Sequence, residues 1–237
     1  MVKRVLLSWS SGKDSAWALH VLRQREDVEV VGLLTTFNEA AGRVAMHAVR
    51  RELVVAQAAA AGLPLWPVWL PSPCSNEAYE AIIRDVVTKA RTARITQFAF
   101  GDLFLEDVRA YRVRQLDGSG IEPMFPIWTT PDDTPALAGQ MLEAGLRATL
   151  TCVDPRLLDS GFAGRSFDAS LLDELPPTVD PCGERGEFHT FCCAGPMFRS
   201  EIRVLGETVI RDGFCFADLR PEAGERSSTP HGAKAAV

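Results

Sequence analysis

Short apolar runs alternate with helical stretches through the first half of the chain, and this alternation is the strongest constraint on its fold. Because short strand–helix–strand connections make consecutive strands parallel, we predict a five-stranded parallel sheet with helices on both faces. Pro67 places the third strand at an edge of that sheet, and Ser75 is the expected N-cap of the next helix. The predicted strands cover residues 3–9, 28–37, 64–70, 96–101 and 122–128, and the predicted helices cover residues 13–25, 46–62, 75–92 and 105–116.

The pattern becomes irregular in the second half of the chain. A helix over 133–145 and a strand over 146–154 still fit the first sheet, and glycine- and proline-rich segments with two strand-like pieces near 197–216 follow. The end of the chain is polar and rich in small side chains, which is typical of disorder. The expected division is an α/β domain over 1–130, a smaller α+β domain over 131–220 and a disordered tail over 221–237.

The composition is that of a globular protein, with 46% hydrophobic and 24% charged residues in a chain of 237. The net charge of −6 gives no overall basic field, which disfavours tRNA and DNA as partners. No apolar run approaches the roughly 18 residues of a membrane span, and the run after Arg4 is too short for a signal peptide. We therefore expect a cytoplasmic protein whose six cysteines are thiols.

Residues 10–15, Ser-Ser-Gly-Lys-Asp-Ser, connect the first predicted strand to the first predicted helix. A turn of small residues leaves backbone N–H groups free at the helix N-terminus, and the helix dipole makes that end an anion site. Gly12 allows close approach of an oxygen, and Lys13 adds a positive charge. The spacing fits neither a Walker A loop nor a GxGxxG dinucleotide motif. Phosphate or pyrophosphate is the expected guest, and a capped helix start without a ligand is the alternative.

The same six residues resemble the SGGxDS pyrophosphate loop of the N-type ATP pyrophosphatases, with Ser11 in place of the first glycine. The segments GDLFLEDVRAYR, PMFPIW, GRSFD, DPCGERGEFHTF and GPMF follow in order between residues 101 and 198. Together they resemble the diphthine–ammonia ligase (diphthamide synthase) family over residues 3–217. The segments SWSSGKDS, MHAVR (46–50) and FGDLFLEDVRAYR together look most similar to a prokaryotic subgroup described as ATP-binding or as adenine nucleotide α-hydrolases.

This resemblance implies a Rossmann-like (HUP-type) fold and an ATP-dependent ligase. In the implied reaction a carboxylate is adenylated with release of pyrophosphate, and ammonia then displaces AMP to leave an amide. The family's substrate is diphthine on translation elongation factor 2, so ATP, ammonia and elongation factor 2 are the implied partners. Ser11 departs from the family pattern, which has a glycine at this position, and serine resists the positive φ that glycine tolerates. His189 is a second departure, because the eukaryotic members carry another residue at this position. The alternative is an ATP-binding protein or nucleotide hydrolase with an unknown substrate.

The loop and the ends of neighbouring strands form the expected ATP site. The resemblance places adenine at the end of the second strand, where the backbone would bind it. His47 begins the following helix, and a purely structural role is the alternative for this residue. The expected ATP-binding residues are Ser10, Ser11, Gly12, Lys13, Asp14, Ser15, Leu34, Thr35, Thr36, His47 and Gly101.

Charged residues near this site are candidate catalytic groups. Negative charge builds on the leaving pyrophosphate in the transition state, where Lys13 and the loop amides would stabilise it. Asp14 and Asp102 are candidate ligands of Mg²⁺, although Asp102 also fits a helix N-cap. Arg109 and Arg112 lie three residues apart on one helix face and are expected to bind phosphate or a substrate carboxylate, with a solvated helix face as the alternative.

Residues 180–190 concentrate polar side chains between glycines, on a segment expected to be a loop. Glu184 and Glu187 are candidates to bind ammonium, to act as a base toward ammonia or to ligate a metal. Cysteines and a histidine nearby allow zinc, but the absence of a CxxC pair disfavours both zinc and the sulfur-transferring relatives. The expected catalytic residues are Lys13, Asp14, Asp102, Glu184 and Glu187, and the expected substrate-binding residues are Arg109, Arg112, Gly183, Glu184, Gly186, Glu187, His189 and Thr190. The edge strand and the compact second part leave room for a homodimer.

Overall fold

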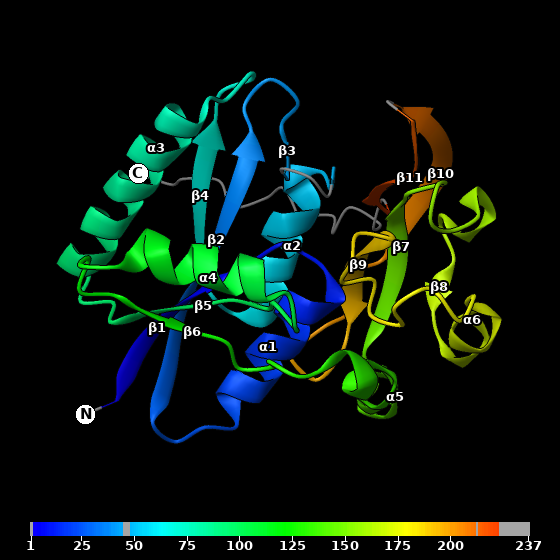
Figure 1. The fold of residues 1–237 in the computed structure, drawn as a ribbon, viewed down its shortest axis with the longest axis horizontal. Helices are drawn as coiled ribbons and strands as arrows, with labels where there is room; N and C mark the ends of the chain where they lie inside the picture. The colour runs from blue at the N-terminus through cyan, green and yellow to red at the C-terminus, as the bar shows by residue number, and fades with distance from the viewer. Residues whose placement is uncertain (1, 45–47, 212, 223–237) are drawn as a thin grey trace, which may run out of the picture.

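The computed structural model describes residues 2–44, 48–211 and 213–222. Two β-sheets lie side by side in this part of the chain, and helices α1 and α2 lie next to the second sheet (Figure 1). The first sheet contains strands from the first half of the sequence, and the second contains strands from the second half. The functional site described below lies where the two halves meet.

The first sheet, sheet A, is built mainly of parallel strands. It contains five parallel strands, as predicted, and their order is β4-β2-β1-β5-β6. A short antiparallel strand, β3, pairs with the end of β2. Among the described strands β4 pairs with β2 alone, so the edge position expected from Pro67 is confirmed. The strands are β1 (Lys3–Ser8), β2 (Val28–Asn38), β3 (Arg43–Val44), β4 (Leu65–Leu70), β5 (Gln97–Ala99) and β6 (Glu122–Met124).

Four helices connect these strands and cover both faces of sheet A, which confirms the predicted layers. Successive side chains of β1 point to opposite faces, so Leu7 joins the core under α1 and α2 whereas Leu6 joins the core under α3. Ser75 caps α3 by accepting a hydrogen bond from the Ala78 amide, as expected. The helices are α1 (Lys13–Arg23), α2 (Arg51–Ala61), α3 (Asn76–Thr92) and α4 (Glu106–Leu116).

The second sheet, sheet B, is antiparallel and differs from the expectation in two ways. The strand expected over 146–154 is β7, but it belongs to sheet B because it pairs with β8, β9 and β11. The segment expected as a loop after Glu187 is strand β9, whose alternate side chains Phe188, Thr190 and Cys192 are buried. Its elements are η1 (Pro131–Asp133), α5 (Thr134–Glu143), β7 (Arg147–Val153), η2 (Ser160–Phe162), β8 (Ser166–Phe167), α6 (Ala169–Glu174), β9 (Phe188–Ala194), β10 (Val204–Arg211) and β11 (Phe214–Pro221).

One hydrophobic core runs from sheet A into sheet B. It contains Leu7 and Trp9 from the first half, together with Phe167, Phe188 and Phe191 from the second half. Burial of these side chains stabilises the contact between the halves by the usual hydrophobic effect. The division into two domains at residue 130 therefore stays a prediction, because the same hydrophobic core contains residues from both sides of this boundary.

Two further expectations concern segments at or beyond the limits of the structure. Pro221, expected in a disordered tail, still belongs to β11, and residues 223–237 lie outside the described residues. Within 2–44, 48–211 and 213–222, every helix is too short or too polar to cross a lipid bilayer.

Candidate active site

A cavity of about 200 Å³ opens where the carboxyl ends of β1 and β5 meet the N-terminus of α1 and strand β9. In open parallel sheets this is the usual position of a ligand. Both halves of the chain line the cavity. The lining residues are Ser8, Ser10, Gly12, Lys13, Asp14, Ser15, Phe100, Gly101, Asp102, Arg112, Cys182, Gly183, Glu184, Phe188, His189 and Thr190. We call residues 10–15 the loop wall and residues 180–187 the acidic wall.

The loop wall turns sharply at Ser11, which has a φ of 73°. Serine resists a positive φ, and Ser11 adopts one nevertheless. The carbonyl of Ser11 accepts hydrogen bonds from the Cys192 amide and the Gln57 side chain, both at 2.9 Å. Beyond the turn, the hydroxyls of Ser10 and Ser15 lie 3.2 Å apart, and both residues line the cavity. The family position of a glycine is thus occupied by a serine in a glycine-like conformation.

Gly12 and Gly101 allow close approaches around the loop wall. A Cβ on Gly12 would lie 3.2 Å from the Thr190 carbonyl oxygen. The absence of a side chain at Gly12 therefore allows strand β9 to pack closely against the loop wall. A Cβ on Gly101 would lie 2.9 Å from the Ser15 amide nitrogen, a clash with backbone that cannot move aside. Gly101 therefore lets the end of β5 pack against the first turn of α1, which brings Asp102 to the cavity.

Lys13 is almost fully buried and connects the two walls. Its ammonium group lies 2.8 Å from Asp14 Oδ1 and also donates to the carbonyl oxygen of Cys182 in the acidic wall. The rings of Phe167 and Phe188 lie within 5.7 Å of the ammonium group. Burial alone would lower the pKa of Lys13, but the neighbouring Asp14 and Cys182 hold it above its ordinary value. Lys13 is thus a fixed positive charge at the floor of the cavity.

Asp102 and Arg112 form a second ion pair in the cavity, with Arg112 Nε 3.5 Å from Asp102 Oδ2. Burial raises the pKa of Asp102 even though Arg112 opposes the shift. The Arg112 guanidinium also lies over the ring of Phe100, which fixes its plane. Arg109 does not line the cavity, unlike Arg112. Its guanidinium group lies over the ring of Trp128.

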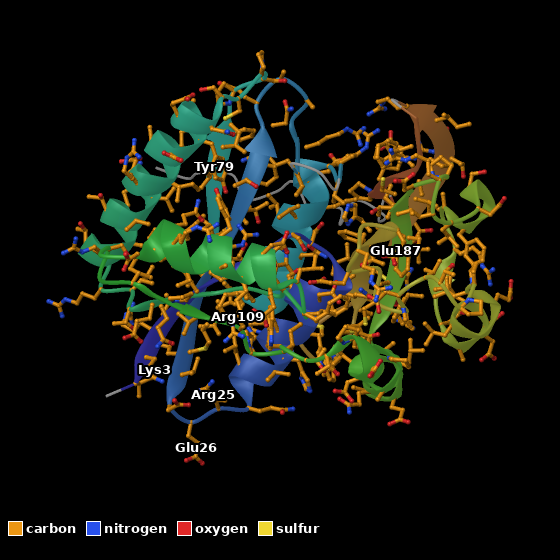
Figure 2. All side chains as sticks on the ribbon, in the orientation of Figure 1. Lys3, Arg25, Glu26, Tyr79, Arg109 and Glu187 are labelled. Atoms are coloured by element: carbon orange, nitrogen blue, oxygen red, sulfur yellow. The ribbon has the colours of Figure 1, made fainter. Side chains whose placement is uncertain are left out.

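The acidic wall is a turn held together by its own carboxylates. The Asp180 carboxylate accepts from the Glu184 amide at 2.8 Å, and Glu187 accepts from the amides of Asp180 and Arg185 at 2.9 and 3.0 Å. Glu187 is buried and does not line the cavity, whereas Glu184 does. Neither Glu187 nor Arg109, two of the predicted site residues, lines the cavity. Figure 2 shows Glu187 near β7 and Arg109 on α4.

Glu184 is the carboxylate of the acidic wall that reaches the cavity. Its Oε1 accepts a hydrogen bond from the Leu103 amide at 2.8 Å. Burial raises the pKa of Glu184 to about 7, because this bond and Lys13 offset only part of the loss of solvation while Asp14 adds to the rise. A carboxyl group with this pKa can accept and return a proton near neutral pH.

His189 and Thr190 lie on β9 and not on a loop. Thr190 Oγ1 accepts a hydrogen bond from the Lys13 amide at 3.0 Å, so it occupies one donor of the α1 N-terminus. Burial and the neighbouring Lys13 lower the pKa of His189 to about 4, which keeps its imidazole neutral at physiological pH. Gly183 lines the cavity between these residues and Glu184, and Gly186 lies outside it.

The region expected to bind adenine lies outside the cavity. Pairing of β2 with β1 ends at Leu34, and pairing with β3 begins at Phe37, so Thr35 and Thr36 lie between these two partners. The Thr35 hydroxyl donates to the Trp9 carbonyl oxygen at 2.9 Å, which ties this strand to the start of the loop wall. His47, the other residue expected near the nucleotide, lies outside the described residues.

The candidate metal ligands Asp14 and Asp102 line the same cavity. Among the residues that the structure describes, no group of three or more histidine, cysteine or acidic side chains is arranged to bind a metal ion. All six cysteines are free, and Cys182 contacts the site through its carbonyl oxygen. The cavity is also lined by Ser8, Phe100, Cys182 and Phe188, which were not predicted to lie there. No pattern in the sequence marks such apolar or small side chains as part of a site.

Comparison with protein-family models gives matches over both halves of the chain. The diphthamide synthase N-terminal domain matches residues 3–119, and the diphthamide synthase C-terminal domain matches residues 133–216. A comparison with curated proteins gave no match. Diphthamide synthases amidate diphthine in an ATP-dependent reaction, so the chain is an ATP-dependent ligase of diphthamide biosynthesis. With both domain models matched in order, the chain belongs to the diphthamide synthase, or diphthine–ammonia ligase, family.

Proposed function

We propose that the cavity between the loop wall and the acidic wall is where diphthine is adenylated by ATP and then amidated by ammonia. The observation that supports this proposal is the meeting of the two walls in one cavity. A phosphate-binding loop, two ion pairs and a carboxyl group with a pKa of about 7 lie within it. These are the groups that pyrophosphate release and attack by ammonia each require.

In the first step, a carboxylate oxygen of diphthine forms a bond to the α-phosphorus of ATP, and the bond from that phosphorus to the pyrophosphate oxygen breaks. Donors around the pyrophosphate stabilise the charge that it gains. The hydroxyls of Ser10 and Ser15, the N-terminus of α1 and the Arg112 guanidinium face the cavity and would serve this purpose. Lys13 adds positive potential from the floor while remaining paired with Asp14.

Asp14 and Asp102 fit a divalent cation by their chemistry. Both line the cavity, and burial raises the pKa of each carboxyl group above its ordinary value. A cation beside them would stabilise their charged forms and lower both pKa values again. In this proposal Asp14 and Asp102 hold Mg²⁺, which neutralises phosphate charge when bound.

In the second step, the nitrogen of ammonia forms a bond to the acyl carbon, and the bond from that carbon to the AMP oxygen breaks. The attacking nitrogen loses a proton, and Glu184 is the group in the cavity suited to accept it. Glu187 has a different role in this proposal, since its carboxylate bonds to two amides of the acidic wall. It positions Glu184 and does not touch the reacting atoms.

The remaining predicted residues would bind the substrates of this reaction. Thr35 and Thr36 pair with Pro67 and Val68 of β4 on one side. On their other side they lie between the β1 and β3 partners of β2, and there the backbone is suited to bind adenine by hydrogen bonds. His189, Thr190 and Gly183 line the side that would receive the diphthine side chain. Arg109, held over Trp128 outside the cavity, would contact elongation factor 2 around the modified side chain. We retain the cytoplasm as the location of the enzyme and a homodimer as its proposed assembly.

The test is product analysis with elongation factor 2 carrying diphthine, ATP, Mg²⁺ and ammonium. We expect AMP, pyrophosphate and amidated factor in equal amounts, and no amide when ammonium is omitted. Two arginines of α4 provide a matched pair. Arg112→Gln should raise KM for ATP about a hundredfold because it removes a donor inside the cavity, whereas Arg109→Gln should raise KM for elongation factor 2 and leave KM for ATP unchanged. Formation of ADP, or equal effects of both variants on ATP, would contradict the proposal.

A further inference from the structure

We propose that Gln57 of α2 is a positioning residue that holds the phosphate-binding loop in its working conformation. The inference rests on the proposed function of the loop wall as the pyrophosphate site. Gln57 is fully buried and lies outside the cavity. After the first two residues of α2, it is the one polar residue in a run of valine, leucine and alanine. It acts on the reaction only through the residues to which it bonds.

The Gln57 side-chain amide makes three hydrogen bonds within the core. Its Oε1 accepts from the Trp9 indole N–H at 2.9 Å, and its Nε2 donates to the carbonyl oxygens of Ser11 at 2.9 Å and Cys192 at 2.7 Å. Because an indole N–H can only donate, Oε1 must face Trp9 and Nε2 must face the two carbonyls. The orientation of the amide is therefore fixed, and all of its near contacts are complementary.

Ser11 needs an external partner because its conformation is unfavourable. A φ of 73° lies in the left-handed region, which is unfavourable for a residue with a side chain. The Ser11 hydroxyl is also buried, and none of the described residues gives it a hydrogen-bond partner. The two hydrogen bonds to the Ser11 carbonyl, from Gln57 Nε2 and the Cys192 amide, offset these costs.

The direction of the Ser11 carbonyl decides where the next amide points. In a trans peptide the C=O and the following N–H point in opposite directions. Since Gln57 and Cys192 draw the Ser11 carbonyl away from the cavity, the Gly12 N–H points toward Ser10, whose Oγ lies 3.3 Å away and lines the cavity. Loss of the Gln57 donor would allow this peptide to rotate, and the loop would then present a carbonyl to phosphate.

The experiment compares Gln57→Met with Trp9→Phe in the full-length enzyme. Methionine has a similar volume but lacks the donor, and we expect it to raise KM for ATP about tenfold, the effect of losing one buried hydrogen bond, with KM for ammonium unchanged. Trp9→Phe removes the third partner of Gln57 and leaves both bonds to the carbonyls in place. It should lower the melting temperature but change KM for ATP less than twofold.

Ser11→Gly supplies a rescue that a merely structural role of Gln57 would not allow. Glycine adopts positive φ without strain and removes the unpartnered hydroxyl. Added to Gln57→Met, it should restore most of the lost affinity for ATP. If the methionine variant fails to fold, Gln57→Glu replaces it, because its protonated form still donates one hydrogen bond and ATP affinity should therefore improve as the pH falls.

An unchanged KM for ATP in Gln57→Met, or equal effects of Gln57→Met and Trp9→Phe, would overturn the inference. Failure of the double variant to recover would also overturn it. If the wild-type enzyme forms no AMP and pyrophosphate, the proposed function fails instead. Calorimetric titration of wild type and Gln57→Met with ATP then tests the positioning role by itself, with the same tenfold difference expected in Kd.

Discussion

The two walls of the cavity are held in place by different kinds of contact. The loop wall depends on residues outside itself, because Gln57 and Thr190 bond to its backbone from α2 and β9. The acidic wall depends mainly on its own atoms, because the carboxylates of Asp180 and Glu187 accept from amides within the same turn. One wall is thus positioned by the packing of the two halves, and the other keeps its shape by itself.

This difference predicts how far the effect of a substitution in each wall extends. A change in the acidic wall should stay local and affect the chemistry more than the fold. A change in the loop wall should loosen the contact between the halves and affect both. Lys13 belongs to the loop wall but donates to the Cys182 carbonyl of the acidic wall. A substitution of Lys13 therefore tests directly whether the two walls differ in this way.

Lys13→Met should have the largest effect. It removes positive potential next to the phosphates, and we expect the rate of AMP formation to fall about a thousandfold. It also leaves Asp14 without its partner in a buried site, which should lower the free energy of unfolding by about 3 kcal/mol. Both values can be measured, by product assay and by urea unfolding.

The double variant Lys13→Met with Asp14→Asn separates these two losses. Without an unpaired charge, the free energy of unfolding should recover while the activity stays lost. A fully active and stable Lys13→Met enzyme would show that the buried ion pair contributes to neither, and the comparison of the walls would then have no basis at this residue.

Glu184→Gln should come next, with a rate of amide formation about a hundredfold lower and adenylation little changed. The pH dependence gives a second signature. The native pKa of Glu184, about 7, lies above its ordinary 4.5, so its contribution to stability is present below pH 4.5 and lost as the pH rises through 7. The difference in unfolding free energy between wild type and Glu184→Gln should shift by at most about 3 kcal/mol across this range.

Glutamine at 184 keeps an acceptor for the Leu103 amide, so the fold should be preserved. Unfolding without nucleotide, at pH values from 4.5 to 8, measures the predicted shift. A flat difference over this range would mean that Glu184 titrates outside it, and the assignment of a base role would lose its support.

Glu187→Gln should give the smallest effect. Glutamine retains one acceptor for the amides of Asp180 and Arg185 but turns a donor toward the other, which should lower the free energy of unfolding by about 2 kcal/mol. KM for ATP should stay unchanged, because the two amides that Glu187 accepts from both belong to the acidic wall and not to the loop wall. A large rise in KM for ATP would contradict the independence of the two walls.

The layers of sheet A were predictable because each buried parallel strand is a continuous apolar run followed by a helix. Sheet B was less predictable, since antiparallel pairs form between segments far apart in sequence. Leu150 in β7 pairs with Thr190 in β9, and no local pattern specifies that partner. Strand β9 was missed because His189 and adjacent cysteines interrupt its apolar character.

The sequence predicted those cavity residues whose side chains carry a charge. It did not predict the residues whose role depends on their position in the fold. Lys13, Asp102 and Glu184 carry ionisable groups, which marked them in the sequence, and all three line the cavity. Glu187 has the same charge but caps backbone amides, a distinction that depends on the folded turn. Gln57 gave no signal, because a single glutamine in an apolar helix has no pattern until its partners are known.

The edge position of β4 bears on how the molecule avoids its own copies. A free strand edge is a template on which other chains can pair and polymerise. Pairing of β4 with β2 runs without a register shift from Leu65 to Leu70, and the exposed Pro67 lies in the middle of it. Proline has no N–H to offer an incoming strand. The β4 edge of sheet A is therefore a poor template for fibre-like growth by strand addition.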